Sequence, residues 1–208
     1  MAQQRGLDRI VNLSDAVVAI AATLLVLPLV DSAQELLGQS GREVLAENTN
    51  NLLAFVLSFA VICRLWLVHH ELYRGVIGFN HALIWANFLW VLCIAFLPFP
   101  TELISAGIHD TTNNALYVGT ILLANVAFTL QEWIVIRSPE LQEESVRQQL
   151  VVYPAVVSTI ALVLALVIAA SLPSVGLYAL LLLFPAGWID SWVTRRRAAR
   201  AKVAAGTR

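Results

Sequence analysis

The chain has 208 residues, of which 59% are hydrophobic and only 13% are charged, and its formal net charge is −1. An average soluble domain is roughly 45–50% apolar and about 25% charged. The composition excludes a disordered chain and an ordinary water-soluble domain, because too little polar surface is available to cover a core of this size. It predicts an integral membrane protein.

Long stretches without a charged side chain predict membrane-spanning helices. No Asp, Glu, Lys or Arg occurs in residues 75–101, 111–131 or 148–189. One bilayer crossing needs about 20 apolar residues in a helix, whereas a transmembrane barrel shows segments of about ten residues with alternating hydrophobicity. We therefore expect an all-α integral membrane protein, a single domain over residues 1–208, with six transmembrane helices. Their approximate bounds are 10–30, 50–70, 78–98, 114–136, 150–171 and 175–193.

The basic residues predict the orientation of these six helices. Lys and Arg accumulate in the cytoplasmic loops of membrane proteins, and here all those outside the predicted spans lie on one side except Arg42. Both termini are therefore expected in the cytoplasm. The basic tail, residues 195–208, is interpreted as a cytoplasmic segment that contacts anionic lipid, not nucleic acid. Acidic residues such as Asp31 lie on the opposite side, where they attract cations.

The first predicted span has two different faces. A helix advances about 100° per residue, so positions separated by three, four or seven residues share a face. Ile20, Leu24 and Leu27 form an apolar stripe, and Thr23 lies at its edge. Such a stripe in a membrane span usually faces lipid or other helices, so periodicity alone does not assign it a role. Asp15 lies on roughly the opposite side of the helix.

Asp15 is the most informative single residue, because a carboxylate inside a membrane span is costly and normally has a partner or water. Either it lies near the cytoplasmic interface and has little role, or it anchors a buried polar network. The candidate partners are polar or aromatic side chains near the ends or middle of the first three spans. They are Arg9, Ser14, Arg64, Trp66, His69, His70 and Asn87.

Motifs of known enzymes and metal sites do not occur in the sequence. The adjacent His69 and His70 point about 100° apart on a helix, so they are poorly placed to share a metal. No P-loop, GxSxG, HExxH or dinucleotide-binding motif is present. We expect no enzyme activity, no cofactor and no bound metal.

Three motifs over residues 9–100 together resemble the endolysosomal potassium channel family named for transmembrane protein 175. Arg9-x-x-x-Leu13-Ser14-Asp15 is similar to the family signature Arg-x-x-x-Phe-Ser-Asp, with Leu13 in place of the signature phenylalanine. The stretch that follows looks like the first helix of the family. The other two motifs come in the same order as in the family: Leu57-Ser58-Phe59 with Trp66-x-x-His69-His70, and Asn87 with Leu97-Pro98-Phe99.

The resemblance implies a fold and a function. Prokaryotic members have a single six-helix repeat and form homotetramers, in which the first helix of each copy lines a central pore. This chain has one repeat, so the resemblance implies a homotetramer in the plasma membrane of a prokaryote. The family's hydrophobic constriction corresponds to Ile20, with Leu24 and Leu27 as further rings, and Thr23 corresponds to a position that favours potassium. The network that holds the first helix corresponds to Arg9, Ser14, Asp15, Trp66, His69, His70 and Asn87.

The expected function is therefore a passive, potassium-preferring cation channel, which needs no cofactor and whose partners are potassium ions, the lipid bilayer and other copies of itself. The stripe carries no charge between Ala16 and Leu27, so a ring of apolar side chains would gate by steric closure and dewetting. The alternative is a proton-coupled carrier or proton leak that uses Asp15, His69 and His70. Carriers often show two inverted repeats, and no clear internal repeat is visible here.

Overall fold

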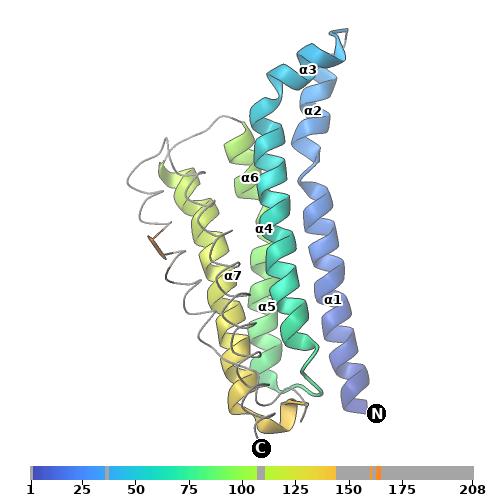
Figure 1. The fold of residues 1–208 in the computed structure, drawn as a ribbon, viewed down its shortest axis with the longest axis vertical. Coiled ribbons are helices and arrows are strands. Elements are labelled where there is room, and N and C mark those ends of the chain that lie inside the picture. The colour runs from blue at the N-terminus through green and yellow to red at the C-terminus, as the bar shows by residue number, and fades with distance from the viewer. Residues whose placement is uncertain (1, 36–37, 107–110, 144–159, 161–162, 165–208) are drawn as a thin grey trace, which may run out of the picture.

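The structure is a computed structural model, and it describes residues 2–35, 38–106, 111–143, 160, 163 and 164. Long helices run side by side along the longest axis of the molecule (Figure 1). Seven α-helices and one 3₁₀ helix occur within these residues. They are α1 (Ala2–Leu24), α2 (Leu27–Glu35), α3 (Gly41–Glu47), α4 (Thr49–Tyr73), α5 (His81–Phe96), α6 (Pro98–Ser105), α7 (Thr111–Arg137) and η1 (Pro139–Leu141).

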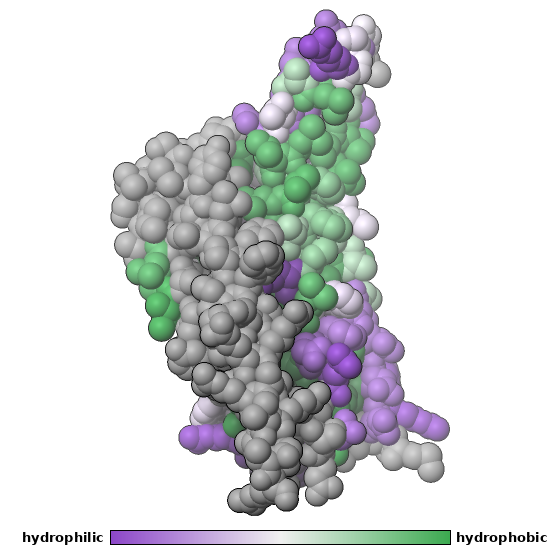
Figure 2. Space-filling view, in the orientation of Figure 1, coloured by the Kyte–Doolittle hydropathy of each residue, from purple (hydrophilic) through white to green (hydrophobic). Residues whose placement is uncertain are grey.

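Within the described residues, four stretches of helix are long and apolar enough to cross a membrane. They are Gln4–Gln34, Thr49–Tyr73, His81–Ser105 and Thr111–Arg137. These positions agree with the first four spans expected from the sequence, and the chain is a multi-pass, helical membrane protein. The remaining expected spans, 150–171 and 175–193, and the basic tail 195–208 lie outside the described residues. Figure 2 shows apolar surface between a polar tip at α3 and polar surface near the N-terminus.

The first span is built from two helices, because α1 ends at Leu24 and α2 begins at Leu27. Pro28 has no N–H, and its ring conflicts with the carbonyl four residues before it. The backbone therefore tightens at the break: the N–H of Val26 donates to the Thr23 carbonyl at 3.3 Å. The third span is divided in a similar way before Pro98, so α6 continues α5 in Figure 1.

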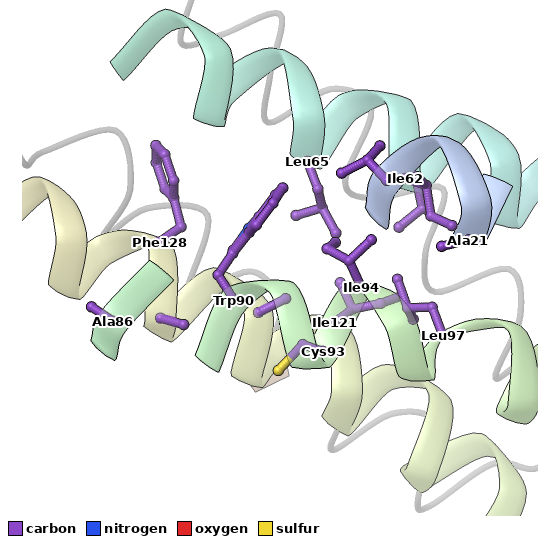
Figure 3. Packing of buried hydrophobic residues seen from close by; sticks show 14 of the residues in the cluster. Ala21, Ile62, Leu65, Ala86, Trp90, Cys93, Ile94, Leu97, Ile121 and Phe128 are labelled. Carbon is purple, nitrogen blue, oxygen red and sulfur yellow. The ribbon is translucent and has the colours of Figure 1, made fainter. Parts of the chain in front are cut away.

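The buried core lies where α1, α4, α5 and α7 meet. Trp90, Ile62 and Ile94 are fully buried there (Figure 3). Small side chains such as Ala21 of α1 and Ala124 of α7 are buried too, at 1% and 0% exposure. Because the membrane supplies no strong hydrophobic force between helices, close approach at small residues is what brings such helices together. The core thus packs against one face of α1 and holds the helix in place.

Candidate functional site

The stripe on the first span faces away from the core of its own chain. Ile20 is 58% exposed, Leu24 41% and Leu27 49%, and Thr23 is exposed beside them. The opposite face of α1 is buried, with Ala21 at 1%. The periodicity noted in the sequence therefore separates a face packed on the bundle from a face that the single chain leaves uncovered.

Thr23 lies at the end of α1, immediately before the helix break. Its hydroxyl donates a hydrogen bond of 2.8 Å to the carbonyl of Ile20 in the same helix. A hydroxyl has one proton and two acceptor lone pairs. The proton is used within the helix, and the oxygen lone pairs remain available on the exposed stripe.

Ser14 connects α1 to α5 and α4 through a buried chain of hydrogen bonds. The amide Nδ2 of Asn87 donates to Ser14 Oγ at 2.9 Å, and Ser14 Oγ lies 3.0 Å from the carbonyl of Ile10. His69 Nε2 lies 2.8 Å from Asn87 Oδ1. Since an amide oxygen only accepts, His69 is the donor in this bond. Ser14, His69 and Asn87 are at most 1% exposed, so all three polar groups are satisfied without water.

Asp15 is held by a different helix from its neighbour Ser14. Trp66 Nε1 of α4 donates a hydrogen bond of 2.8 Å to Asp15 Oδ1. The Trp66 ring is stacked on His70, with ring centroids 5.2 Å apart. Arg9 is exposed and makes no hydrogen bond or ion pair with Asp15. The structure thus brings together Ser14, Asp15 and their aromatic and amide partners on α4 and α5, but leaves Arg9 outside this group.

Two ring contacts of His69 and one hydrogen bond of the neighbouring Tyr73 were not expected from the sequence. The His69 ring lies between Trp90, at 4.1 Å between centroids, and Tyr73, at 4.5 Å. Tyr73 Oη donates to Gln131 Oε1 of α7 at 3.0 Å, and Gln131 is fully buried. Uncharged Gln in an apolar span is a signal that could have identified Gln131, because its amide must find partners in the membrane.

A second buried polar cluster lies where α4, α6 and α7 meet. Thr101 Oγ1 is 3.0 Å from Ser58 Oγ, which is 2.8 Å from Tyr117 Oη. The three residues are 2–3% exposed. Ser58 belongs to a motif that the sequence singled out, but its partners on α6 and α7 were missed. The cluster joins the three helices α4, α6 and α7.

Several polar side chains form hydrogen bonds beyond the outer end of the first span. Asp31 is exposed on α2, and the next residue, Ser32, is hydrogen-bonded to Asn48 at the start of α4. Glu43 on α3 accepts hydrogen bonds from the backbone N–H and the hydroxyl of Ser40, at 2.9 and 2.8 Å. These bonds lower the pKa of the Glu43 carboxyl from its ordinary value. In the described part of the chain, no group of three or more His, Cys, Asp or Glu residues is placed to hold a metal.

Comparison with known proteins gives a consistent result. Residues 9–98 match the family described as "Endosomal/lysosomal potassium channel TMEM175". A protein of Chamaesiphon minutus named as a potassium channel is 34% identical over 130 residues, which is 61% of this chain and 64% of that protein. A protein of Streptomyces collinus with the same kind of name is 29% identical over 123 residues, 59% of each chain. A third, from a Chryseobacterium species, is 28% identical over 62% of this chain and 65% of its own length.

The matched part therefore spans less than two thirds of the length of each of these relatives. A solved structure is similar over more of the chain. It is the crystal structure of a "lysosomal potassium-selective channel TMEM175 homolog" from Chamaesiphon minutus. The two structures superpose with a TM-score of 0.60 at 26% identity, over 88% of this chain and 99% of the other. The matched residues 9–98 include the stripe on α1 and the contacts of Ser14 and Asp15.

Proposed function

Because the chain belongs to the endosomal/lysosomal potassium channel TMEM175 family, we propose that it is a potassium-preferring cation channel that conducts passively through a pore lined by α1. Four copies surround the pore, and α1 of each copy turns its exposed stripe toward the axis. Ile20 forms the constriction, Leu24 and Leu27 form further rings, and the oxygen of Thr23 contributes the preference for potassium. The channel lies in the plasma membrane with both termini in the cytoplasm.

The observation that carries this proposal is the broken helix on the exposed face of α1. Backbone that leaves the regular helical pattern is tolerated at membrane depth only where it is covered by protein or lines a water-filled cavity. The break at Leu25 and Val26 lies beside Leu24 and Leu27, which the single chain leaves exposed. The break beside an exposed stripe supports the proposal that this face of the first span lines a water-filled pore.

The proposed gate is apolar. In the stretch from Ala16 to Leu27 the stripe carries no charged side chain, so no carboxylate ring coordinates ions there. A narrow ring of Ile20 side chains excludes water and ions until the helices move apart or rotate. Potassium sheds its hydration water at a lower cost than sodium, so a narrow, weakly polar pore favours it. Asp31 at the outer end concentrates cations without choosing among them.

The network around Asp15 has a positioning role in this proposal. Ser14 and Asp15 are bonded to α5 and α4, so they fix the rotation of α1 and therefore the face that it turns to the axis. His69 and Asn87 support Ser14, and Trp66 with the stacked His70 supports Asp15. Arg9 is proposed to contribute from the cytoplasmic end, where it is exposed.

Reconstitution of the purified protein in a planar bilayer tests the proposed function. We expect unitary currents that reverse near the potassium equilibrium potential in a potassium gradient. A carrier or proton leak through Asp15, His69 and His70 would instead give flux that saturates without unitary events and depends on a proton gradient, and that result would overturn the channel proposal. Native mass spectrometry of the same sample should show four chains.

A further inference from the structure

The carbonyl of Leu24 lacks the hydrogen bond that a helix normally provides. In an α-helix the carbonyl of one residue accepts from the N–H four residues later, but here that residue is Pro28, which has none. The next N–H, that of Leu29, donates to the carbonyl of Val26 at 3.1 Å. Within the described residues, the Leu24 carbonyl receives no backbone hydrogen bond.

Nearby side chains do not replace the missing donor. The hydroxyl of Thr23, the polar side chain next to it in sequence, donates to the Ile20 carbonyl at 2.8 Å. No hydrogen bond from a described side chain to Leu24 is present. A carbonyl in the bilayer core that accepts no hydrogen bond carries a large desolvation cost, unless water, protein or an ion contacts it.

The position of Leu24 determines which of these partners is available. Leu24 is 41% exposed and lies on the stripe between Ile20 and Leu27. Helix carbonyls point toward the C-terminal end of their helix, so the Leu24 oxygen points from the Ile20 level toward the outer side. Lipid chains offer it nothing, whereas a pore offers it water and cations.

We propose that the Leu24 carbonyls of the assembled copies form a ring that binds a partly dehydrated monovalent cation of potassium size, on the outer side of the Ile20 constriction. The site rests on the proposed function, since one chain supplies only one oxygen. Neutral carbonyl oxygens are suitable ligands for hard cations, and rings of them replace the hydration shell in ion-selective pores. Unwound backbone in membrane helices coordinates cations in transporters by the same chemistry.

This ring and Thr23 would together discriminate between potassium and sodium. The Thr23 oxygen lies one residue earlier and has its proton engaged, so it too offers only lone pairs to the pore. A cation leaving the apolar Ile20 ring would therefore meet two consecutive layers of neutral oxygen. The backbone layer depends on Pro28 and not on the identity of the Leu24 side chain.

Pro28→Ala tests the site, because alanine restores the N–H that can bond the Leu24 carbonyl. We expect currents to persist, and the potassium-to-sodium permeability ratio under bi-ionic conditions to fall by roughly threefold or more. Pro98→Ala is the matched control, since it removes a proline at the break between α5 and α6, away from the stripe. It should leave the ratio unchanged. An unchanged ratio in conducting Pro28→Ala channels would overturn the carbonyl site.

A second variant keeps the test decisive if Pro28→Ala does not assemble. Replacing the amide between Leu24 and Leu25 with an ester weakens the Leu24 carbonyl as a ligand and keeps Pro28 in place. The permeability ratio should fall here too, and an unchanged ratio again overturns the site. If the unmodified protein gives no potassium current at all, the proposed channel function itself fails. The two failures are therefore distinguishable.

Discussion

Trp66 Nε1 and Asp15 Oδ1 are 2.8 Å apart, and this hydrogen bond joins α4 to the carboxylate on α1. The preceding residue, Ser14, is bonded to Asn87 on α5. Neighbouring residues of a helix point about 100° apart, so two such bonds to two different helices determine the rotation of α1 about its axis. The same bonds thereby determine which residues of α1 stay exposed.

Trp66→Phe should reduce the stability of the assembled protein by about 1.5–3 kcal/mol, the range expected for a hydrogen bond to a charged group. Phenylalanine keeps the stacking on His70 but removes the indole N–H. Thermal unfolding in detergent measures the effect. Trp85→Phe is the control, because Trp85 is 70% exposed and should tolerate the change. Equal stability of Trp66→Phe and Trp85→Phe would show that the Trp66–Asp15 hydrogen bond does not stabilise the protein.

Asn87→Leu should cost about 1–3 kcal/mol, because it leaves the buried His69 without the acceptor of its N–H. Adding His69→Phe should recover part of this loss, since phenylalanine retains a ring between Trp90 and Tyr73 and needs no acceptor. Chemical unfolding of both variants gives the comparison. A double variant that is less stable than Asn87→Leu alone would contradict this explanation.

Gly6→Ala should destabilise the packing of the N-terminal end of α1. A Cβ at Gly6 would lie 2.5 Å from Phe79 Cε1, so the ring or the helix must move, at a cost of about 1–3 kcal/mol. Phe79→Leu in the same chain should restore most of the stability. Gly119→Ala is the control: no described heavy atom lies within 4 Å of its Cβ, and alanine favours a helix by about 1 kcal/mol. If Gly6→Ala and Gly119→Ala both lost stability, the contact with Phe79 would not be the cause of the loss in Gly6→Ala.

Ile20→Ala should raise the unitary conductance or weaken the discrimination against sodium, because a smaller side chain widens the proposed constriction. Leu53→Ala on α4 is matched to it, since both residues are 58% exposed and apolar but Leu53 is not on α1. Single-channel recording of the two variants separates a pore effect from a surface effect. Unchanged currents from a folded Ile20→Ala protein would show that Ile20 does not form the constriction.

Acidification should loosen α3 at a lower pH than the ordinary Glu titration suggests. The pKa of Glu43 is lowered from 4.5 by the hydrogen bonds from Ser40. A lowered folded-state pKa means that the stabilising contribution is complete above the unfolded value and is lost as the pH falls through the folded value. The protection of the Gly41–Glu47 amides against hydrogen exchange, relative to the intrinsic exchange rate at each pH, should therefore fall only below pH 4.5. Glu43→Gln should remove this pH dependence, because glutamine does not titrate, and persistence of the dependence in that variant would contradict the role of Glu43.

Local properties of the sequence were sufficient to identify the first four membrane spans and the two faces of α1. Apolar length depends only on consecutive residues, and the stripe of Ile20, Leu24 and Leu27 depends only on helical periodicity. The sequence also limited the partners of Asp15 to a few side chains, because so few polar groups occur in the spans.

The tertiary structure decided which of those candidates meet. Trp66 is 51 residues from Asp15, and it reaches the carboxylate because of the depth and rotation of α4 relative to α1. The same packing places Gln131 of α7 on Tyr73, a contact without any local signal of its partner. Proline at position 28 was visible in the sequence, but the bonds that its neighbours form instead appear only in the folded backbone. Hydrogen bonds between helices depend on how several helices pack at once, and no single segment contains that information.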